Sequence, residues 1–161
     1  MILTRPIFIS LTTAIALISP QALADMNSAR NQYFAKEYRA LCELPTNTFE
    51  TAQSPDEAAQ QSLSVSTPLA ITLKLNNDGQ AYLNLSVENW DEKLVVFHST
   101  GINIEMKDAD TTGQNITNQQ CDQPDMTITH INTHEWGSYP VKVVGTPNET
   151  ITLKIHQEQN R

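Results

Sequence analysis

Strict alternation of apolar and polar residues is the feature that most constrains the fold of this chain. In LAITLKL (69–75), the residues at 69, 71, 73 and 75 are Leu or Ile, and those between them are Ala, Thr and Lys. The same period of two runs through 82–88, 102–107, 139–143 and 151–156, and more weakly through 93–97 and 126–131. Because alternate side chains of a strand point to opposite faces, this pattern predicts strands with one face on a core and one in water.

Turn-forming residues separate these segments, at 77–79, 89–91, 99–101, 108–113 and 146–148. Seven or eight short strands at this spacing predict an antiparallel β-sandwich, of the jelly-roll or immunoglobulin-like kind, over residues 67–161. The chain is therefore expected to be mainly β.

Residues 25–66 are predicted to form an N-terminal helix and a linker packed on the sandwich. Phe34, Tyr38 and Leu41 follow the spacing of one helix face, and Pro45 is expected to end that helix. The stretch Ser54-Pro55-Asp56-Glu57 is a typical helix start, with a capping Ser, a Pro in the first position and a Glu in the third. It predicts a short second helix over DEAAQQSL (56–63).

The first 24 residues have the features of a secretory signal peptide. Arg5 precedes an apolar run at 7–18, and Ala22-Leu23-Ala24 predicts cleavage after Ala24. We therefore expect export to the periplasm or beyond, and no later apolar run is long enough to span a membrane. In an oxidising compartment the two cysteines, Cys42 and Cys121, are expected to form a disulfide worth about 4 kcal/mol.

Net charge narrows the choice of partners. The whole chain carries −8; removing the signal segment lowers Lys+Arg from 10 to 9, leaves Asp+Glu at 18, and gives −9. Such a balance argues against nucleic acid and against anionic membrane surfaces. Two interpretations stay open: a cationic partner, or acidity that only keeps an exported protein in solution.

The stretch CDQPDMTITHINTHEWG (121–137) gathers metal-ligand residue types. Its β-branched residues predict a strand, on which His130 and His134 would lie about 13 Å apart and could not share one ion. We therefore predict no metal site. A soft copper site from His98, Met126 and His130, and hence a copper carrier, stays open as an alternative that depends on the fold. Asp108–Gly113 resembles a calcium loop only weakly, because it lacks the terminal Glu.

No catalytic motif is present: the chain has no G-x-S-x-G elbow, no H-E-x-x-H and no Gly-rich phosphate loop among its five Gly. We expect a protein that is not an enzyme and needs no cofactor. The predicted binding surface comprises loops at one end of the sandwich, with Trp90, His98, Trp136, Ser138 and Tyr139. The alternative is purely structural, with the Trp side chains at the core edge and Tyr139 pointing inward.

Several strands resemble a known type of domain. GQAYLNLSV (79–87) resembles the G-Q-x-x-x-L-x-L strand of bacterial pre-peptidase C-terminal-like jelly-roll domains, and GSYPVKV (137–143) resembles their G-x-Y-x-V-x-V strand. KLVVF (93–97) and ITLKI (151–155) resemble their next and closing strands. The resemblance covers residues 69–156 and implies a fold more than a function.

The same region is similar to periplasmic inhibitors of invertebrate- and goose-type lysozymes, in which a Ser-Gly-x-Tyr loop enters the enzyme cleft. The matching residues here are Trp136-Gly137-Ser138-Tyr139, with Trp in place of the first Ser. Our leading prediction is an exported, non-catalytic module that recognises a protein or glycan through the end loops. The resemblance implies one alternative, an inhibitor of a lysozyme-like or other cell-wall-directed enzyme with a cationic surface.

Overall fold

A computed structural model describes residues 20–122 and 125–158 of the chain. Most of the predicted signal peptide lies outside these residues, and the predicted cleavage position after Ala24 falls within the first helix. Among the described residues, no helix has both the length and the apolar character needed to cross a membrane.

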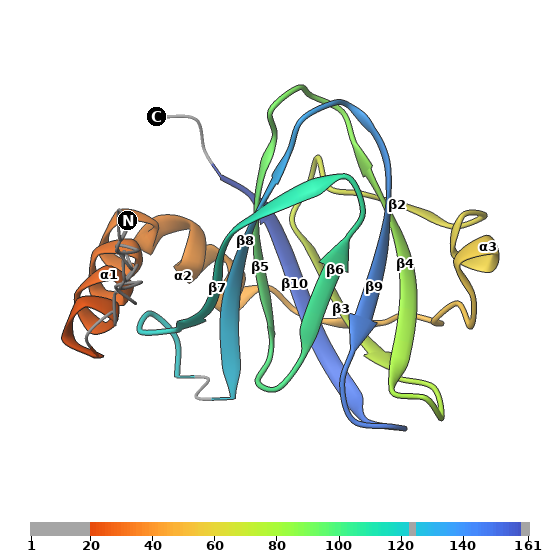
Figure 1. The fold of residues 1–161 in the computed structure, drawn as a ribbon, viewed down its shortest axis with the longest axis horizontal. Helices are drawn as coiled ribbons and strands as arrows, with labels where there is room; N and C mark the ends of the chain where they lie inside the picture. Colours follow the sequence, from red (N-terminus) through yellow and green to blue (C-terminus); the bar gives the residue numbers. More distant parts are fainter. Residues whose placement is uncertain (1–19, 123–124, 159–161) are drawn as a thin grey trace, which may run out of the picture.

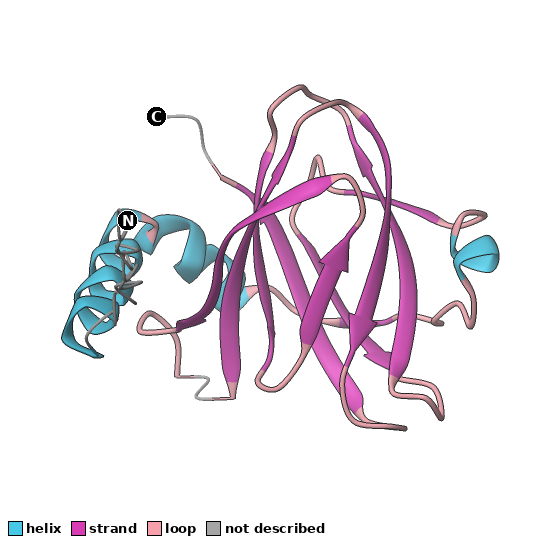
Figure 2. Cartoon of the chain, in the orientation of Figure 1, coloured by secondary structure: helices cyan, strands magenta, loops and turns pink. Residues whose placement is uncertain are grey.

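Two sheets pack face to face as a sandwich, with α1 (Pro20–Tyr33) and α2 (Ala35–Glu43) on one side and the short helix α3 (Pro55–Ala58) on the other (Figure 1, Figure 2). The six-stranded sheet has the order β1-β3-β10-β5-β8-β7 and the four-stranded sheet the order β2-β4-β9-β6. The strands are β1 (Asn47–Thr48), β2 (Ser62–Ser64), β3 (Leu69–Lys74), β4 (Gln80–Val87), β5 (Lys93–Ser99), β6 (Asn103–Met106), β7 (Ala109–Thr117), β8 (Met126–Thr133), β9 (Gly137–Val144) and β10 (Thr150–Gln157). The mainly β sandwich fold is thereby confirmed, and each of the seven strands predicted from alternation is present.

Three further strands correct the prediction of seven or eight antiparallel strands. β1 and β2 come from the predicted linker and pair in parallel with β3 and β4, so both sheets are mixed. β7 occupies a segment predicted to be a turn, which also carries the weak resemblance to a calcium loop. Its polar residues do not alternate because it is an edge strand, mostly exposed, with irregular pairing to β8 between Thr111 and Ile116.

The helices are α1 (Pro20–Tyr33), α2 (Ala35–Glu43) and α3 (Pro55–Ala58). The predicted N-terminal helix is interrupted at Phe34, although the amide of Tyr38 still donates to the Phe34 carbonyl at 2.9 Å. It ends at Glu43, before Pro45 as predicted, because the residue preceding a proline is extended. The Ser54 cap is confirmed, since its Oγ accepts from the amide of Glu57 at 3.2 Å. That helix is shorter than predicted because residues 62–64 pair with β4.

Two apolar clusters explain where alternation is strict and where it fails. The first lies between the sheets and includes Leu73, Leu85 and Val96. The second lies on the outer face of the six-stranded sheet, where Tyr38 and Leu41 of α2 cover Val95, Phe97 and Ile128. The central strands β5 and β8 are therefore buried on both faces, which removes the polar positions that alternation needs.

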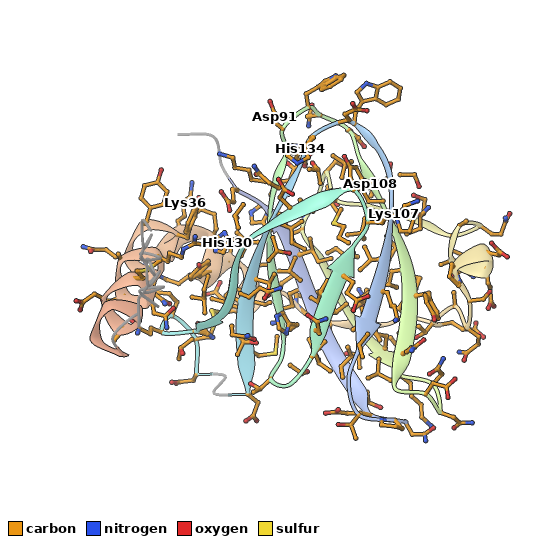
Figure 3. All side chains as sticks on the ribbon, in the orientation of Figure 1. Lys36, Asp91, Lys107, Asp108, His130 and His134 are labelled. Carbon is orange, nitrogen blue, oxygen red and sulfur yellow. A yellow bond between two sulfur atoms is a disulfide. The ribbon has the colours of Figure 1, made fainter. Side chains whose placement is uncertain are left out.

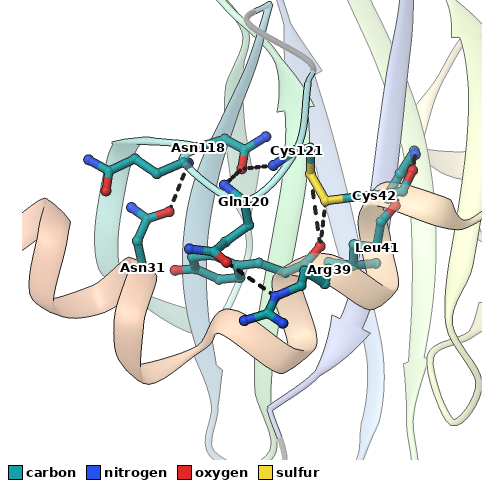
Figure 4. Close-up of a disulfide and its surroundings, with 10 residues drawn as sticks. Asn31, Arg39, Leu41, Cys42, Asn118, Gln120 and Cys121 are labelled. Atoms are coloured by element: carbon teal, nitrogen blue, oxygen red, sulfur yellow. Dashed lines mark hydrogen bonds between the residues drawn. A yellow bond between two sulfur atoms is a disulfide. The ribbon is translucent and has the colours of Figure 1, made fainter.

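The helix layer is fastened to the sheet at its C-terminal end (Figure 4). Cys42 and Cys121 form the predicted disulfide, with their Cα atoms 5.6 Å apart. Buried Lys154 of β10 donates from Nζ to the carbonyl oxygens of Leu41 and Cys42, at 2.9 and 3.0 Å. A cation at a helix C-terminus interacts favourably with the helix dipole, and burial lowers the pKa of this lysine.

Candidate functional site

Two turns that carry the chain between the sheets meet at one end of the sandwich. One joins β4 to β5 (residues 88–92) and the other joins β8 to β9 (residues 134–136). Val87 pairs with Gly137, and the amide of Thr133 donates to the Glu92 carbonyl at 2.8 Å, so the turns are neighbours. Asp91 and His134 mark them in Figure 3. We call residues 88–92 and 134–136 the tryptophan end.

Trp90 and Trp136 are the most exposed large apolar side chains in the described part of the chain, at 63% and 64% of their surface. An indole exposed to this extent adds little to the core, because its free energy of burial scales with the area removed from water. Packing at the core edge, the structural alternative for both residues, is therefore wrong. Each tryptophan instead leaves most of its side chain exposed to solvent.

The first turn is held in place by the buried residue Glu92. Its carboxylate accepts from the backbone amide of Asn89 at 3.3 Å and from the side-chain amide of Gln157. Its carbonyl oxygen accepts from the amide and the Oγ1 of Thr133, at 2.8 and 2.9 Å. These bonds fix the backbone on both sides of Trp90, so less conformational entropy is lost when a partner orders the turn.

The second turn is held by Tyr139, which is only 6% exposed. Its hydroxyl donates to the carbonyl oxygen of Glu135 at 2.7 Å and accepts from the amide of the same residue at 3.2 Å. A tyrosine that bonds back to the backbone just upstream resembles the tyrosine corner of β-sandwiches. Tyr139 therefore points inward, as the structural alternative predicted, and supports the turn that carries Trp136.

The other two predicted contact residues lie in strands, outside the two turns. His98 is 1% exposed within β5; its Nε2 lies 2.9 Å from the Oγ1 of Thr129 and its Nδ1 lies 3.0 Å from the Ser99 carbonyl oxygen. Burial lowers the pKa of this histidine, and we exclude it from the surface. Ser138 is exposed and donates to the Oδ1 of Asn84 at 2.8 Å, on the outer face of the four-stranded sheet.

Exposed carboxylates surround the tryptophan end. Asp91 and Glu135 lie within the two turns, and Asp110 of β7 lies beside them, with its Oδ2 3.0 Å from the Nε2 of His134. Asp108 faces Lys107 at 4.0 Å, with both side chains mostly exposed (Figure 3). The potential at this end is therefore negative.

The fold separates the three residues of the alternative copper site. His98 pairs with Thr127, and both point toward the core between the sheets. His130 pairs with Val95, which belongs to the cluster beneath the helices, and Met126 lies in that same cluster. Since His98 lies on one face of the sheet and the other two on the opposite face, they cannot share an ion. Among the described residues, no group of three His, Cys, Asp or Glu side chains could hold a metal.

The structure also reveals a buried polar chain that the sequence did not predict. His130 of β8 is 1% exposed; its Nε2 lies 2.7 Å from the Tyr38 hydroxyl, and its Nδ1 lies 2.5 Å from the Oε1 of Glu158. Tyr38 is fully buried, and burial raises the pKa of its hydroxyl. Because the Tyr38 hydroxyl has no access to solvent, it cannot attack a substrate. These hydrogen bonds therefore have a structural role: they hold α2 against the six-stranded sheet. No sequence signal could have found this polar chain, since its members are 92 and 28 residues apart.

No family model matches this chain, and no curated protein is significantly similar to it. The resemblances to pre-peptidase C-terminal-like domains and to lysozyme inhibitors therefore stay predictions.

Proposed function

We propose that this protein is an exported, non-catalytic binding module whose tryptophan end recognises a positively charged protein surface. One observation carries the proposal: Trp90 and Trp136 are both about two-thirds exposed on neighbouring turns that buried hydrogen bonds hold in place. Tryptophan is enriched among the residues that dominate binding energy at protein interfaces. A rigid turn also presents it at a low entropic cost.

Charge supports a cationic partner. Asp91, Glu135 and Asp110 are exposed around the two indoles, and the whole chain carries a net charge of −8. Two lysines nearby do not cancel this negative charge. Lys107 faces Asp108 at 4.0 Å. Lys93 lies on the same face of its strand as Val95, which is the outer face of the sheet, on the side of α1 and α2. Lysine or arginine side chains of a partner could pair with the carboxylates and lie over the indole faces.

Export is part of the proposal. The Cys42–Cys121 disulfide supports it, because disulfides persist in oxidising compartments such as the periplasm. The predicted signal peptide over 1–24 is the second support. We therefore propose the periplasm or the exterior of the cell as the location of the protein.

If this protein inhibits a lysozyme, Trp136 rather than Tyr139 must be the residue that contacts the enzyme. Tyr139 is buried and bonded to Glu135, so it is not available to enter an enzyme cleft. Trp136, at the tip of the same turn, is the side chain exposed there. Lysozyme-like enzymes with cationic surfaces remain suitable first partners to test.

The test is an affinity measurement on the mature, disulfide-intact protein with a panel of cationic proteins that includes goose- and invertebrate-type lysozymes. We expect one partner to bind, with a Kd that rises with salt and at least tenfold in Trp90→Ala and Trp136→Ala. Tyr33→Ala, which removes an exposed aromatic residue from α1, is the matched control and should leave the Kd unchanged. A partner whose Kd is the same in both tryptophan variants would overturn the proposal. Binding of neutral glycans alone, lost in those variants, would replace the protein partner with a glycan.

A further inference from the structure

A second candidate site lies at the opposite end of the sandwich, in a groove of about 920 Å³. β1 pairs with only Ile71 and Thr72 of β3, and the amide of Phe49 donates to the Thr72 carbonyl at 2.8 Å. The chain then leaves β3 and crosses to the other sheet, where Ala52 pairs with Tyr82. This crossing strap, residues 49–53, leaves the edge of β3 open over residues 73–75, and the groove forms there.

The far wall of the groove consists of two turns that pack against each other. One joins β3 to β4 and the other joins β9 to β10. The Oδ1 of Asn76 accepts from the amides of Asp78 and Gln80, both at 2.9 Å, and the amide of Gly145 donates to the Gly79 carbonyl at 2.8 Å. A Cβ on Gly79 would lie 2.2 Å from the Gly145 oxygen, so the turns are in close contact. The groove is therefore preformed.

The lining of the groove is rich in hydrogen-bonding groups: amides, which donate and accept, and carboxylates, which accept. It presents exposed amides and carboxylates, from Gln53, Gln61, Asn77, Glu50, Glu57 and Asp78. Phe49, which is half-buried, is the one aromatic side chain among the described lining residues. Thr51 also lines the groove, and its buried Oγ1 has no hydrogen-bond partner among the described residues. Buried polar atoms are normally paired, so a ligand or a water is expected beside it.

This chemistry selects among ligand classes. The lining is too polar for an apolar ligand, since ordinary small-molecule pockets are mostly apolar with few polar groups. The lining also disfavours anionic ligands, because its described residues include three carboxylates and only one cationic side chain, that of Lys74. An added peptide strand would have only residues 73–75 to pair with, which is short for binding at a sheet edge. Hydroxyl groups, which donate and accept equally well, fit paired amides and carboxylates.

We propose that this groove binds a neutral oligosaccharide. Its volume lies in the upper part of the range for ligand pockets, so it can hold more than one sugar unit. Gln80 and Val87 are at the two ends of β4, about 25 Å apart, so the groove and the tryptophan end are separate sites. The proposal does not depend on the function proposed for that end.

The experiment titrates the mature, disulfide-intact protein with neutral hexasaccharides of glucose and of N-acetylglucosamine, followed by calorimetry. We expect one of them to bind, with a Kd that rises at least tenfold in Glu50→Ala and in Gln61→Ala. Both side chains are exposed and face the groove, so the variants should fold, which circular dichroism checks. Asn103→Ala, an exposed residue of β6, is the matched control and should leave the Kd unchanged.

Tryptophan fluorescence distinguishes this site from the tryptophan end. The chain contains two tryptophans, both at that end, so a sugar bound in the groove should leave their emission unchanged. No binding by any of the hexasaccharides to the folded protein would overturn the proposal. Binding that changes the emission, and that Glu50→Ala and Gln61→Ala leave intact, would overturn it too and would place the glycan at the tryptophan end. A cationic peptide that binds the groove in place of sugars would also refute it.

Discussion

Replacing Tyr38 with Phe removes one buried hydroxyl and leaves the aromatic ring in place. The ring packs against Phe34 and Phe97, with centroid distances of 5.9 and 5.4 Å, and these contacts should survive. The hydroxyl lies 2.7 Å from the Nε2 of His130, which is 1% exposed and has no access to replacement water. The variant therefore leaves a buried ring nitrogen without a partner, at a cost of about 1–3 kcal/mol in the free energy of unfolding.

Urea denaturation at neutral pH measures this cost directly, and the matching fall in Tm is about 2–12 °C for a protein of this size. Replacing both His130 and Glu158 with Leu in the Tyr38→Phe background removes all three members of the hydrogen-bonded chain. Part of the stability should then return, because no buried polar atom is left unpaired at that position. If the free energy of unfolding of the single Tyr38→Phe variant lies within about 0.3 kcal/mol of the wild-type value, the reasoning is refuted, because the unpaired His130 nitrogen then costs nothing measurable.

Three further perturbations test how the helix layer and the core are held. Replacing Cys42 and Cys121 together with Ser should lower the free energy of unfolding by about 4–5 kcal/mol, because the bridge spans 79 residues. Lys154→Met should lower it by about 1–3 kcal/mol, because two carbonyls at the end of α2 lose their buried donor. Burial lowers the pKa of His98, so the unfolded chain binds the proton more readily, and stability should fall as the pH drops below about 6.5. His98→Gln should reduce that slope by at most about 1.4 kcal/mol per pH unit.

Each of these predictions has an outcome that contradicts it. A loss below about 1 kcal/mol without the disulfide would mean that the helix layer holds without its covalent link. Lys154→Met should be compared with Lys74→Met, on an exposed position of β3, and equal stability of the two variants would remove the role of the buried cation. An unchanged acid slope in His98→Gln would assign the pH dependence elsewhere. His156, whose pKa is also lowered by burial, is then the next residue to replace.

The sequence predicted the sandwich because alternation reports one buried face per strand, and it failed where that condition does not hold. β5 and β8 alternate weakly because α2 covers their second face, which the sequence of either strand alone cannot indicate. β7 is a polar edge strand, so its residues have the composition of a turn. β1 and β2 contain two and three residues, too few to show a period.

For the candidate site, two sequence features bear on whether a side chain is buried: its place in the strand alternation, which is reliable, and its place beside a turn, which is not. Parity placed Tyr139 inward, because Val141 and Val143 follow it on the same face. A position beside a turn did not determine whether Trp90 and Trp136 were buried or exposed, since either orientation fits the same sequence. The predicted strand ends at residue 97, which put His98 among the end loops, yet β5 continues to Ser99 and neighbouring strands bury His98. The groove combines two segments about 25 residues apart, the second of which includes the β3–β4 turn, with the β9–β10 turn about 70 residues further along, and only the folded chain brings them together.

Tryptophan fluorescence is the most direct test of the proposed recognition surface, because both tryptophans of the chain lie there. The measurement titrates the mature, disulfide-intact protein with the cationic protein that binds best in the affinity panel, at low salt. We expect acrylamide to quench both indoles in the free protein, and binding to blue-shift their emission and protect them from the quencher. A partner that binds by calorimetry while the emission and the quenching stay as they were would contradict recognition through the tryptophan end.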